Sequence, residues 1–181
     1  MRRAWRLASD VRLRTGCLTV LVSAATLLGT AHAAPAPHAC DLYRALEQRC
    51  HCPPADNYFG SYGRKYCERF MASTGWSAAG LRWRDRTAAC LTGELTRFLA
   101  HARGCGCADV KAFAFESHAR CYTAQPASAC RLPLADIARI YGLVDAGDLF
   151  DPLGMRQTLA ITFACVRQNG DAGARPDGPG R

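Results

Sequence analysis

Apolar residues recur along most of this chain at the three- and four-residue spacing of amphipathic helices. The clearest case is the segment from about Ser77 to Ala102, in which Leu81, Ala88, Leu95 and Ala102 recur every seven residues. Side chains at this spacing share one face of a helix, so this segment is predicted to form the longest helix of the fold. Ser77 is the expected N-cap, because a serine hydroxyl can accept a hydrogen bond from the first turn.

Weaker versions of the same pattern predict further helices over 40–50, 62–73, 109–122 and 132–141, and a last helix that begins at Asp151-Pro152. Glycine and proline separate these segments, so 51–60, 104–107 and 145–148 are predicted to be loops. No segment alternates apolar and polar residues as a strand does. The sequence therefore predicts an all-α bundle of about five or six helices, built from antiparallel helical hairpins.

The two ends of the chain differ from this helical middle. Five arginines between Arg2 and Arg14 precede an apolar run, and Ala31-His32-Ala33 follows that run. This order is typical of a secretory signal, so we expect residues 1–33 to be a signal peptide that is cleaved after Ala33. The run is too short to cross a bilayer, and no later stretch is long and apolar enough, which predicts no membrane span. We expect residues 34–167 to form a single disulfide-rich helical domain and 168–181, which lack periodicity, a disordered tail.

The charge balance changes when the export signal is set aside. The full chain carries 23 basic and 15 acidic side chains, a net charge of +8. Residues 1–33 contain five arginines and one aspartate, so the remainder has 18 basic and 14 acidic groups, a net charge of +4. This excess is scattered over the chain, so we expect no nucleic-acid partner. The expected location is secreted: extracellular, or periplasmic in a bacterium.

Cysteine is the most informative residue type in this chain. Of eleven cysteines, Cys17 lies in the predicted signal, which leaves an even set of ten. An even set in an exported chain predicts disulfide bonds that staple the helical bundle. The ten are Cys40, Cys50, Cys52, Cys67, Cys90, Cys105, Cys107, Cys121, Cys130 and Cys165.

Antiparallel hairpins predict which cysteines meet, because positions equally far from the turn lie side by side. Cys90 and Cys121 are centred on the break at 104–107, and Cys130 and Cys165 on the break at 145–148. We predict both pairs on this basis. Two further predicted pairs are Cys50 with Cys67, which flank the proline-rich loop, and Cys40 with Cys52, which would close the N-terminal turn. Cys105 and Cys107 are left to bridge each other, the N-terminal region or a second chain.

The order and spacing of these cysteines resemble the stanniocalcin family of secreted, disulfide-linked helical hormones. The similar stretch runs from about Tyr66 to Cys165 and includes Tyr66-Cys67-Glu68-Arg69-Phe70, the block from Gly80 to Cys90-Leu91, and Cys107 to Cys121-Tyr122. Cys130 and the segment from Leu153 to Cys165 resemble the family's last crosslinked helix.

The resemblance implies a secreted, hormone- or ligand-like protein that acts by contact with a protein partner or receptor, without catalysis. It also implies the Cys90–Cys121 and Cys130–Cys165 bonds. The chain departs from the family in three places. It has no cysteine between Cys52 and Cys67 to pair with Cys107, no Asn-x-Ser/Thr glycosylation site, and no cysteine beyond Cys165 for dimerisation. A homodimer would therefore need other contacts.

A secreted enzyme is the alternative hypothesis, in one of two forms. The first is a degenerate phospholipase-like protein that uses His118, although such chemistry needs an acidic residue after the histidine and Ala119 stands there. The second is a thiol–disulfide oxidoreductase that uses Cys105 and Cys107. Cys50-His51-Cys52 lacks the two-to-four-residue spacing of zinc ligands. We expect no catalytic residue, metal site or cofactor.

Overall fold

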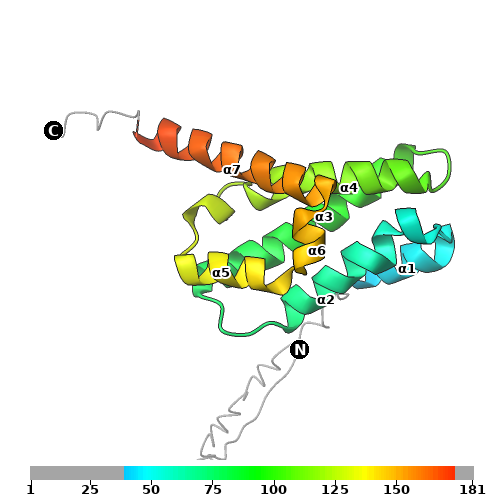
Figure 1. The fold of residues 1–181 in the computed structure, drawn as a ribbon, viewed down its shortest axis with the longest axis horizontal. Coiled ribbons are helices and arrows are strands. Elements are labelled where there is room, and N and C mark those ends of the chain that lie inside the picture. The colour runs from blue at the N-terminus through cyan, green and yellow to red at the C-terminus, as the bar shows by residue number, and fades with distance from the viewer. Residues whose placement is uncertain (1–38, 174–181) are drawn as a thin grey trace, which may run out of the picture. The chain divides into compact units, whose positions relative to one another are not determined.

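The computed structural model describes residues 39–173 and is all-helical over that range, as the sequence predicts (Figure 1). The predicted signal peptide, residues 1–33, lies outside the described residues. The seven α-helices of the described range are α1 (Asp41–Cys50), α2 (Lys65–Ala72), α3 (Ala78–His101), α4 (Cys107–Tyr122), α5 (Leu134–Leu143), α6 (Ala146–Phe150) and α7 (Pro152–Gly173). Shorter helical turns are η1 (Pro54–Asp56), the π-helical η2 (Phe59–Arg64) and η3 (Ala129–Arg131).

The first hairpin consists of α1 and the continuous helical segment formed by η2 and α2. Pro53 and Pro54 turn the chain between the two arms, because neither proline can donate the backbone hydrogen bond that would continue α1. The helix predicted over 62–73 begins earlier than expected, at Phe59. Phe59 is fully buried in a core cluster with Leu46 of α1 and Leu95 of α3, which holds the first hairpin against the second.

The second hairpin pairs α3 with α4, which pack along each other. The turn between them contains Gly104 and Gly106, both with left-handed backbone angles (φ 88° and 37°) that favour glycine. The two helices then run back beside each other, and Figure 1 shows α7 lying across the α4 side of this pair.

The start of α3 is tied to α5 by a buried carboxylate. Ser77 is the N-cap of α3, as predicted, and its Oγ accepts a hydrogen bond from the Gly80 backbone nitrogen at 3.0 Å. Asp136 of α5 is 1% exposed. Its two carboxylate oxygens accept hydrogen bonds from the Ser77 nitrogen at 3.1 Å and from the Ser77 Oγ at 2.5 Å. A Cβ at position 80 would lie 2.6 Å from the Asp136 carboxylate, so this close approach requires glycine.

Two predictions about the C-terminal third are wrong. The loop predicted over 145–148 lies largely within the helix α6, which two ion pairs hold against α2: Lys65 Nζ lies 2.7 Å from Asp145 and 2.8 Å from Asp148. The predicted tail also begins too early, because α7 continues to Gly173. Gln168 anchors this end: its amide donates to the Thr123 carbonyl at 2.6 Å. Residues 174–181 lie outside the described range.

The described helices also bear on the membrane prediction. Within residues 39–173, none is both long enough and apolar enough to cross a bilayer.

Candidate functional site

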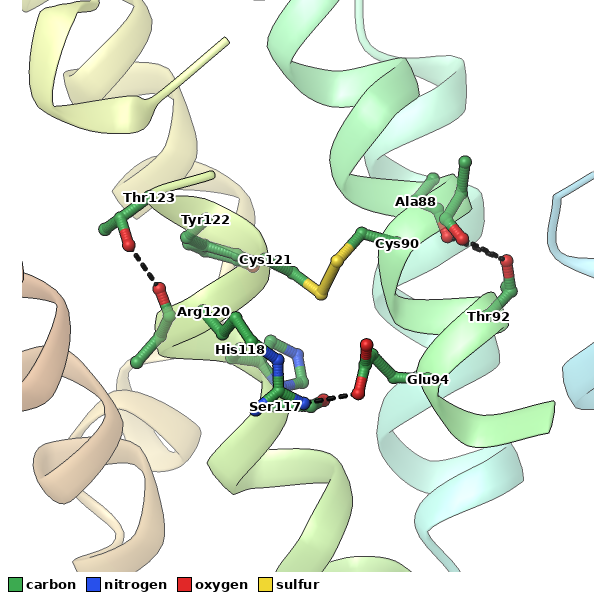
Figure 2. The surroundings of a disulfide bond; sticks show 12 residues. Ala88, Cys90, Thr92, Glu94, Ser117, His118, Arg120, Cys121, Tyr122 and Thr123 are labelled. Carbon is green, nitrogen blue, oxygen red and sulfur yellow. Dashed lines mark hydrogen bonds and ion pairs between the residues drawn. A yellow bond between two sulfur atoms is a disulfide. The ribbon is translucent and has the colours of Figure 1, made fainter. Parts of the chain in front are cut away.

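Five disulfide bonds hold the helices together, with Cα–Cα distances between 5.0 and 5.7 Å. The Cys90–Cys121 and Cys130–Cys165 pairs are those that the hairpin spacing predicts. Figure 2 shows the first of these bonds between α3 and α4, with the Glu94–Arg120 ion pair beside it on the same two helices. The α3–α4 hairpin is therefore crosslinked at a point where its facing side chains also pair.

The other two predicted pairs are wrong, because Cys40 is bonded to Cys67. The two arms of the first hairpin meet at Pro53 and Pro54, so the symmetry centre is near 53.5, which is the midpoint of Cys40 and Cys67. Cys50 lies at the turn end of α1 and is roughly 15 Å along the helix from Cys40. The same symmetry rule would have found this bond, had the second arm been expected to begin at Phe59.

Cys105 and Cys107 form two parallel bonds between the hairpins, Cys50–Cys105 and Cys52–Cys107. Each cysteine pair lies at the turn of its own hairpin, so the two bonds join turn to turn. Cys105 and Cys107 are thus each bonded to a different segment, and neither bridges the other. In this state, neither sulfur is the free thiolate that an oxidoreductase needs for attack.

A pocket of about 340 Å³ lies between the helices and is lined by residues of all seven α-helices of the described range. Tyr141 of α5 and Val166 of α7 line it although they are 46% and 64% exposed, so the pocket opens to solvent between these two helices. Its volume falls in the range of small-molecule sites in proteins. Apolar side chains make up most of its wall: Phe70, Met71, Leu91, Ile137, Ile140, Val144, Leu149 and Ile161.

Buried and partly buried aromatic rings form part of the pocket wall. Trp83 is 1% exposed, and its indole nitrogen donates to the Tyr122 carbonyl at 3.1 Å. The rings of Tyr62 and Tyr66 lie 4.6 Å apart, in edge contact. Burial raises the pKa of the Tyr62 and Tyr122 hydroxyls far above their ordinary value, so both stay neutral. These rings therefore present an uncharged aromatic surface that suits an apolar group.

Two polar side chains interrupt this apolar wall without hydrogen-bond partners of their own. Thr87 of α3 is only 6% exposed, and its Oγ1 is buried with no partner. The Oε1 of Gln157, on α7, is likewise buried and unpaired. Both residues line the pocket.

His118 also lines the pocket, but its surroundings do not make it a catalytic base. It is 4% exposed, and its Nδ1 lies 2.6 Å from the Ala114 carbonyl, one turn back on α4. Burial lowers its pKa to about 4, so the imidazole is neutral at pH 7. Its ring neighbours are Tyr58, Tyr62, Phe115 and Tyr122. No carboxylate orients it, and within residues 39–173 no cluster of three His, Cys, Asp or Glu side chains could hold a metal ion.

A second surface feature lies along α7, next to the mouth of the pocket. Met155, Leu159, Phe163 and Val166 are 45%, 56%, 60% and 64% exposed. Their spacing places them along one face of the helix, which we call the α7 apolar face. The apolar spacing of the last predicted helix does not by itself show which of its apolar side chains face outward.

The pocket could not be predicted from the sequence, because the residues that line it lie far apart along the chain. Thr87 and Gln157 are 70 positions apart and belong to no motif. Of the catalytic candidates, His118 lines the pocket as a neutral side chain, whereas Cys105 and Cys107 do not; Cys67 and Cys165, predicted as disulfide partners, also line it. Comparison with protein-family models, curated proteins and solved structures gives no match for this chain. The stanniocalcin resemblance therefore rests on the residues quoted above.

Proposed function

We propose that this chain is an exported binding protein that acts without catalysis and holds a small apolar molecule in the pocket between α3, α4, α5 and α7. The observation that carries this proposal is the pocket itself, a largely apolar cavity of about 340 Å³ with an open mouth. Bonds at Cys40–Cys67, Cys90–Cys121 and Cys130–Cys165 connect the elements around it. Such crosslinks keep an apolar cavity open where a small core alone would collapse or unfold.

The chemistry of the lining residues favours binding over turnover. The pocket has one imidazole, which burial keeps neutral, and no carboxylate is hydrogen-bonded to it. A hydrolase of the phospholipase type would need a base with an orienting group and a metal-bound carboxylate. An oxidoreductase would need an accessible thiol, whereas both candidate cysteines are bonded.

The test is the binding of a neutral apolar dye, N-phenyl-1-naphthylamine, to the oxidised protein, followed by its fluorescence. We expect saturable binding to the wild-type protein and at least about tenfold weaker binding to Ala88→Trp, because Ala88 lines the pocket. A loss of about 60 Å² of apolar contact already costs about 1.4 kcal/mol, which is tenfold in affinity.

Ala100→Trp is the matched control for this experiment. Ala100 lies on the same helix but is exposed to solvent. Its replacement should leave dye binding unchanged. If the wild-type protein does not bind the dye, or if Ala88→Trp and Ala100→Trp bind it equally, the pocket is not the site and the proposal fails.

Contact with another protein is the second candidate function, and the α7 apolar face favours it. Amphipathic helices commonly bind a partner protein through an exposed row of apolar side chains, and α7 carries four of them. This candidate agrees with the hormone-like role that the stanniocalcin resemblance implies. We expect Phe163→Ser to abolish such association in analytical ultracentrifugation, of the chain with itself or with a candidate receptor, while dye binding remains. Association that survives Phe163→Ser would rule out this face.

A further inference from the structure

We infer that the α7 apolar face rests on the surface of an anionic lipid bilayer, from which the neighbouring pocket takes up its apolar ligand. The second half of this inference rests on the proposed function, since it names the source of the molecule that the pocket would hold. The four side chains of the face are 45% to 64% exposed, whereas the residues with which the same helix lines the pocket are mostly small or polar, such as Thr158, Thr162 and Asn169. This distribution is the reverse of that on an ordinary surface helix, and it leaves the apolar row to be covered by something else.

Exposed arginines border the apolar face. Arg156 and Arg167 are both exposed, and each lies within one helical turn of a residue of the row. Arg131 directly follows the cysteine that is bonded to Cys165 of α7, so a third exposed arginine lies close to the helix. The one acidic residue of α7, Asp171, lies beyond the end of the row. The arginines can therefore reach lipid phosphates while the apolar row enters the bilayer surface.

The same arginines disfavour a second copy of the chain on this face. The row is centred near residue 161, and Arg156 and Arg167 lie five and six positions from that centre, on either side. If two copies of α7 packed antiparallel through their rows, each arginine would face the other arginine of the second copy. In a parallel pair, each would lie beside its own counterpart. Like charges would meet in both arrangements, whereas an anionic bilayer supplies the opposite charge.

The apolar face adjoins the opening of the pocket, because Val166 belongs to the row and also lines the pocket. Apolar molecules leave water for a bilayer, so a bilayer is where such a ligand is concentrated. A protein groove with acidic rims would match the arginines equally well but would not supply a ligand to the pocket. The position of the row at the pocket mouth therefore favours the bilayer.

Co-sedimentation of the oxidised protein with lipid vesicles tests the docking surface. We expect binding to vesicles of about one third phosphatidylglycerol and two thirds phosphatidylcholine, and at least about tenfold weaker binding to pure phosphatidylcholine. Phe163→Ser should weaken binding to the anionic vesicles at least about fivefold, because an aromatic side chain no longer enters the bilayer. Phe163→Leu is the matched control: it keeps an apolar side chain and should bind within about twofold of the wild-type protein.

A double variant, Arg156→Gln with Arg167→Gln, tests the charge. It should bind the anionic vesicles at least about tenfold more weakly and pure phosphatidylcholine unchanged. Arg49→Gln with Arg103→Gln is its control, because it removes the same charge from exposed positions near the disulfide-linked hairpin turns. Figure 1 shows the α3–α4 turn well away from the C-terminal half of α7. This control should bind within about threefold of the wild-type protein.

Uptake of the naphthylamine dye from anionic vesicles tests the link to the pocket. The vesicles also contain a nitroxide-labelled lipid that quenches the dye, so fluorescence rises when the dye enters the protein. If uptake occurs at the bilayer surface, its rate should rise with vesicle concentration for the wild-type protein. For Phe163→Ser, the dye must first dissolve in water, so the rate should be lower and independent of vesicle concentration.

The outcomes distinguish this inference from the proposed function. If the wild-type protein does not bind anionic vesicles, or if Phe163→Ser and Phe163→Leu bind them equally, the docking surface is overturned and the pocket remains a binding site. Vesicle binding with an uptake rate that ignores vesicle concentration would overturn the bilayer as the ligand source. Association with a protein that Phe163→Ser abolishes, without vesicle binding, would assign the face to a protein partner and overturn the inference. Failure to bind free dye without vesicles would overturn the proposed function, while sedimentation would still decide the docking surface.

Discussion

Replacing all four cysteines of the turn-to-turn bonds, Cys50–Cys105 and Cys52–Cys107, with alanine is expected to lower the free energy of unfolding by about 6 kcal/mol. Removing either bond alone should cost only about 2 kcal/mol. The reason is that each bond spans 55 residues of chain, but the two enclose almost the same loop. When one bond is already in place, the second bond closes only a short ring between the two turns, so it removes little further conformational freedom from the unfolded chain.

The Cys130–Cys165 bond is the internal reference for this result. It spans 35 residues and shares its loop with no parallel bond, so its removal should cost about 4 kcal/mol, more than either member of the pair. Four oxidised variants are compared: each bond of the pair removed alone, both removed together, and Cys130–Cys165 removed. Urea unfolding followed by circular dichroism measures the free energy of unfolding of each. If removing one bond of the pair lowered the free energy of unfolding as much as removing Cys130–Cys165, parallel bonding would be contradicted. It would also be contradicted if the loss on removing both bonds equalled the sum of the two single losses. A bond between Cys105 and Cys107 themselves would appear directly in the masses of non-reduced proteolytic fragments.

The stability of the protein is expected to fall by about 3 kcal/mol between pH 7 and pH 4 because of His118 alone. Burial lowers the pKa of His118 in the folded state to about 4. In the unfolded chain, the same side chain titrates near its ordinary value of 6.5. Between these two values, the unfolded state binds a proton that the folded state excludes. The contribution of His118 to stability is therefore complete above pH 6.5 and is lost as the pH falls toward 4.

His118→Gln isolates this effect. A glutamine side chain can still donate to the Ala114 carbonyl but does not titrate, so the unfolding free energy of the variant should depend less on pH across this window. Two aspartates also have lowered pKa values: Asp145 through its pairing with Arg69 and Lys65, and Asp148, despite its partial burial, through hydrogen bonds from Lys65 and Tyr66. Both lose their contribution at lower pH, and the comparison cancels them. A parallel titration by NMR should place the His118 ring midpoint near 4. A midpoint near 6.5, or equal pH slopes for the two proteins, would show that the ring is not desolvated.

The sequence was most informative where a property depends on distances along one helix or across one turn. The amphipathic spacing over 77–102 predicted α3, and the breaks at 104–107 and 145–148 predicted the Cys90–Cys121 and Cys130–Cys165 bonds. The same reasoning failed for Cys40 and Cys67 because one arm of the first hairpin begins three residues earlier than the expected Tyr62. An error of one helical turn is enough to exchange disulfide partners.

The sequence by itself thus determined the helical class, the even cysteine framework and the Cys90–Cys121 bond within one hairpin, because helix periodicity and chain reversal are local properties. It also predicted the Cys130–Cys165 bond, which in the structure joins η3 to α7 across α5 and α6. Only the tertiary structure decided that the two hairpin turns meet, so that Cys50 and Cys52 bond to Cys105 and Cys107. It also decided that Thr87 and Gln157 line one apolar pocket. The physical reason is that both results depend on how separate helices pack, and many packings satisfy the same apolar pattern.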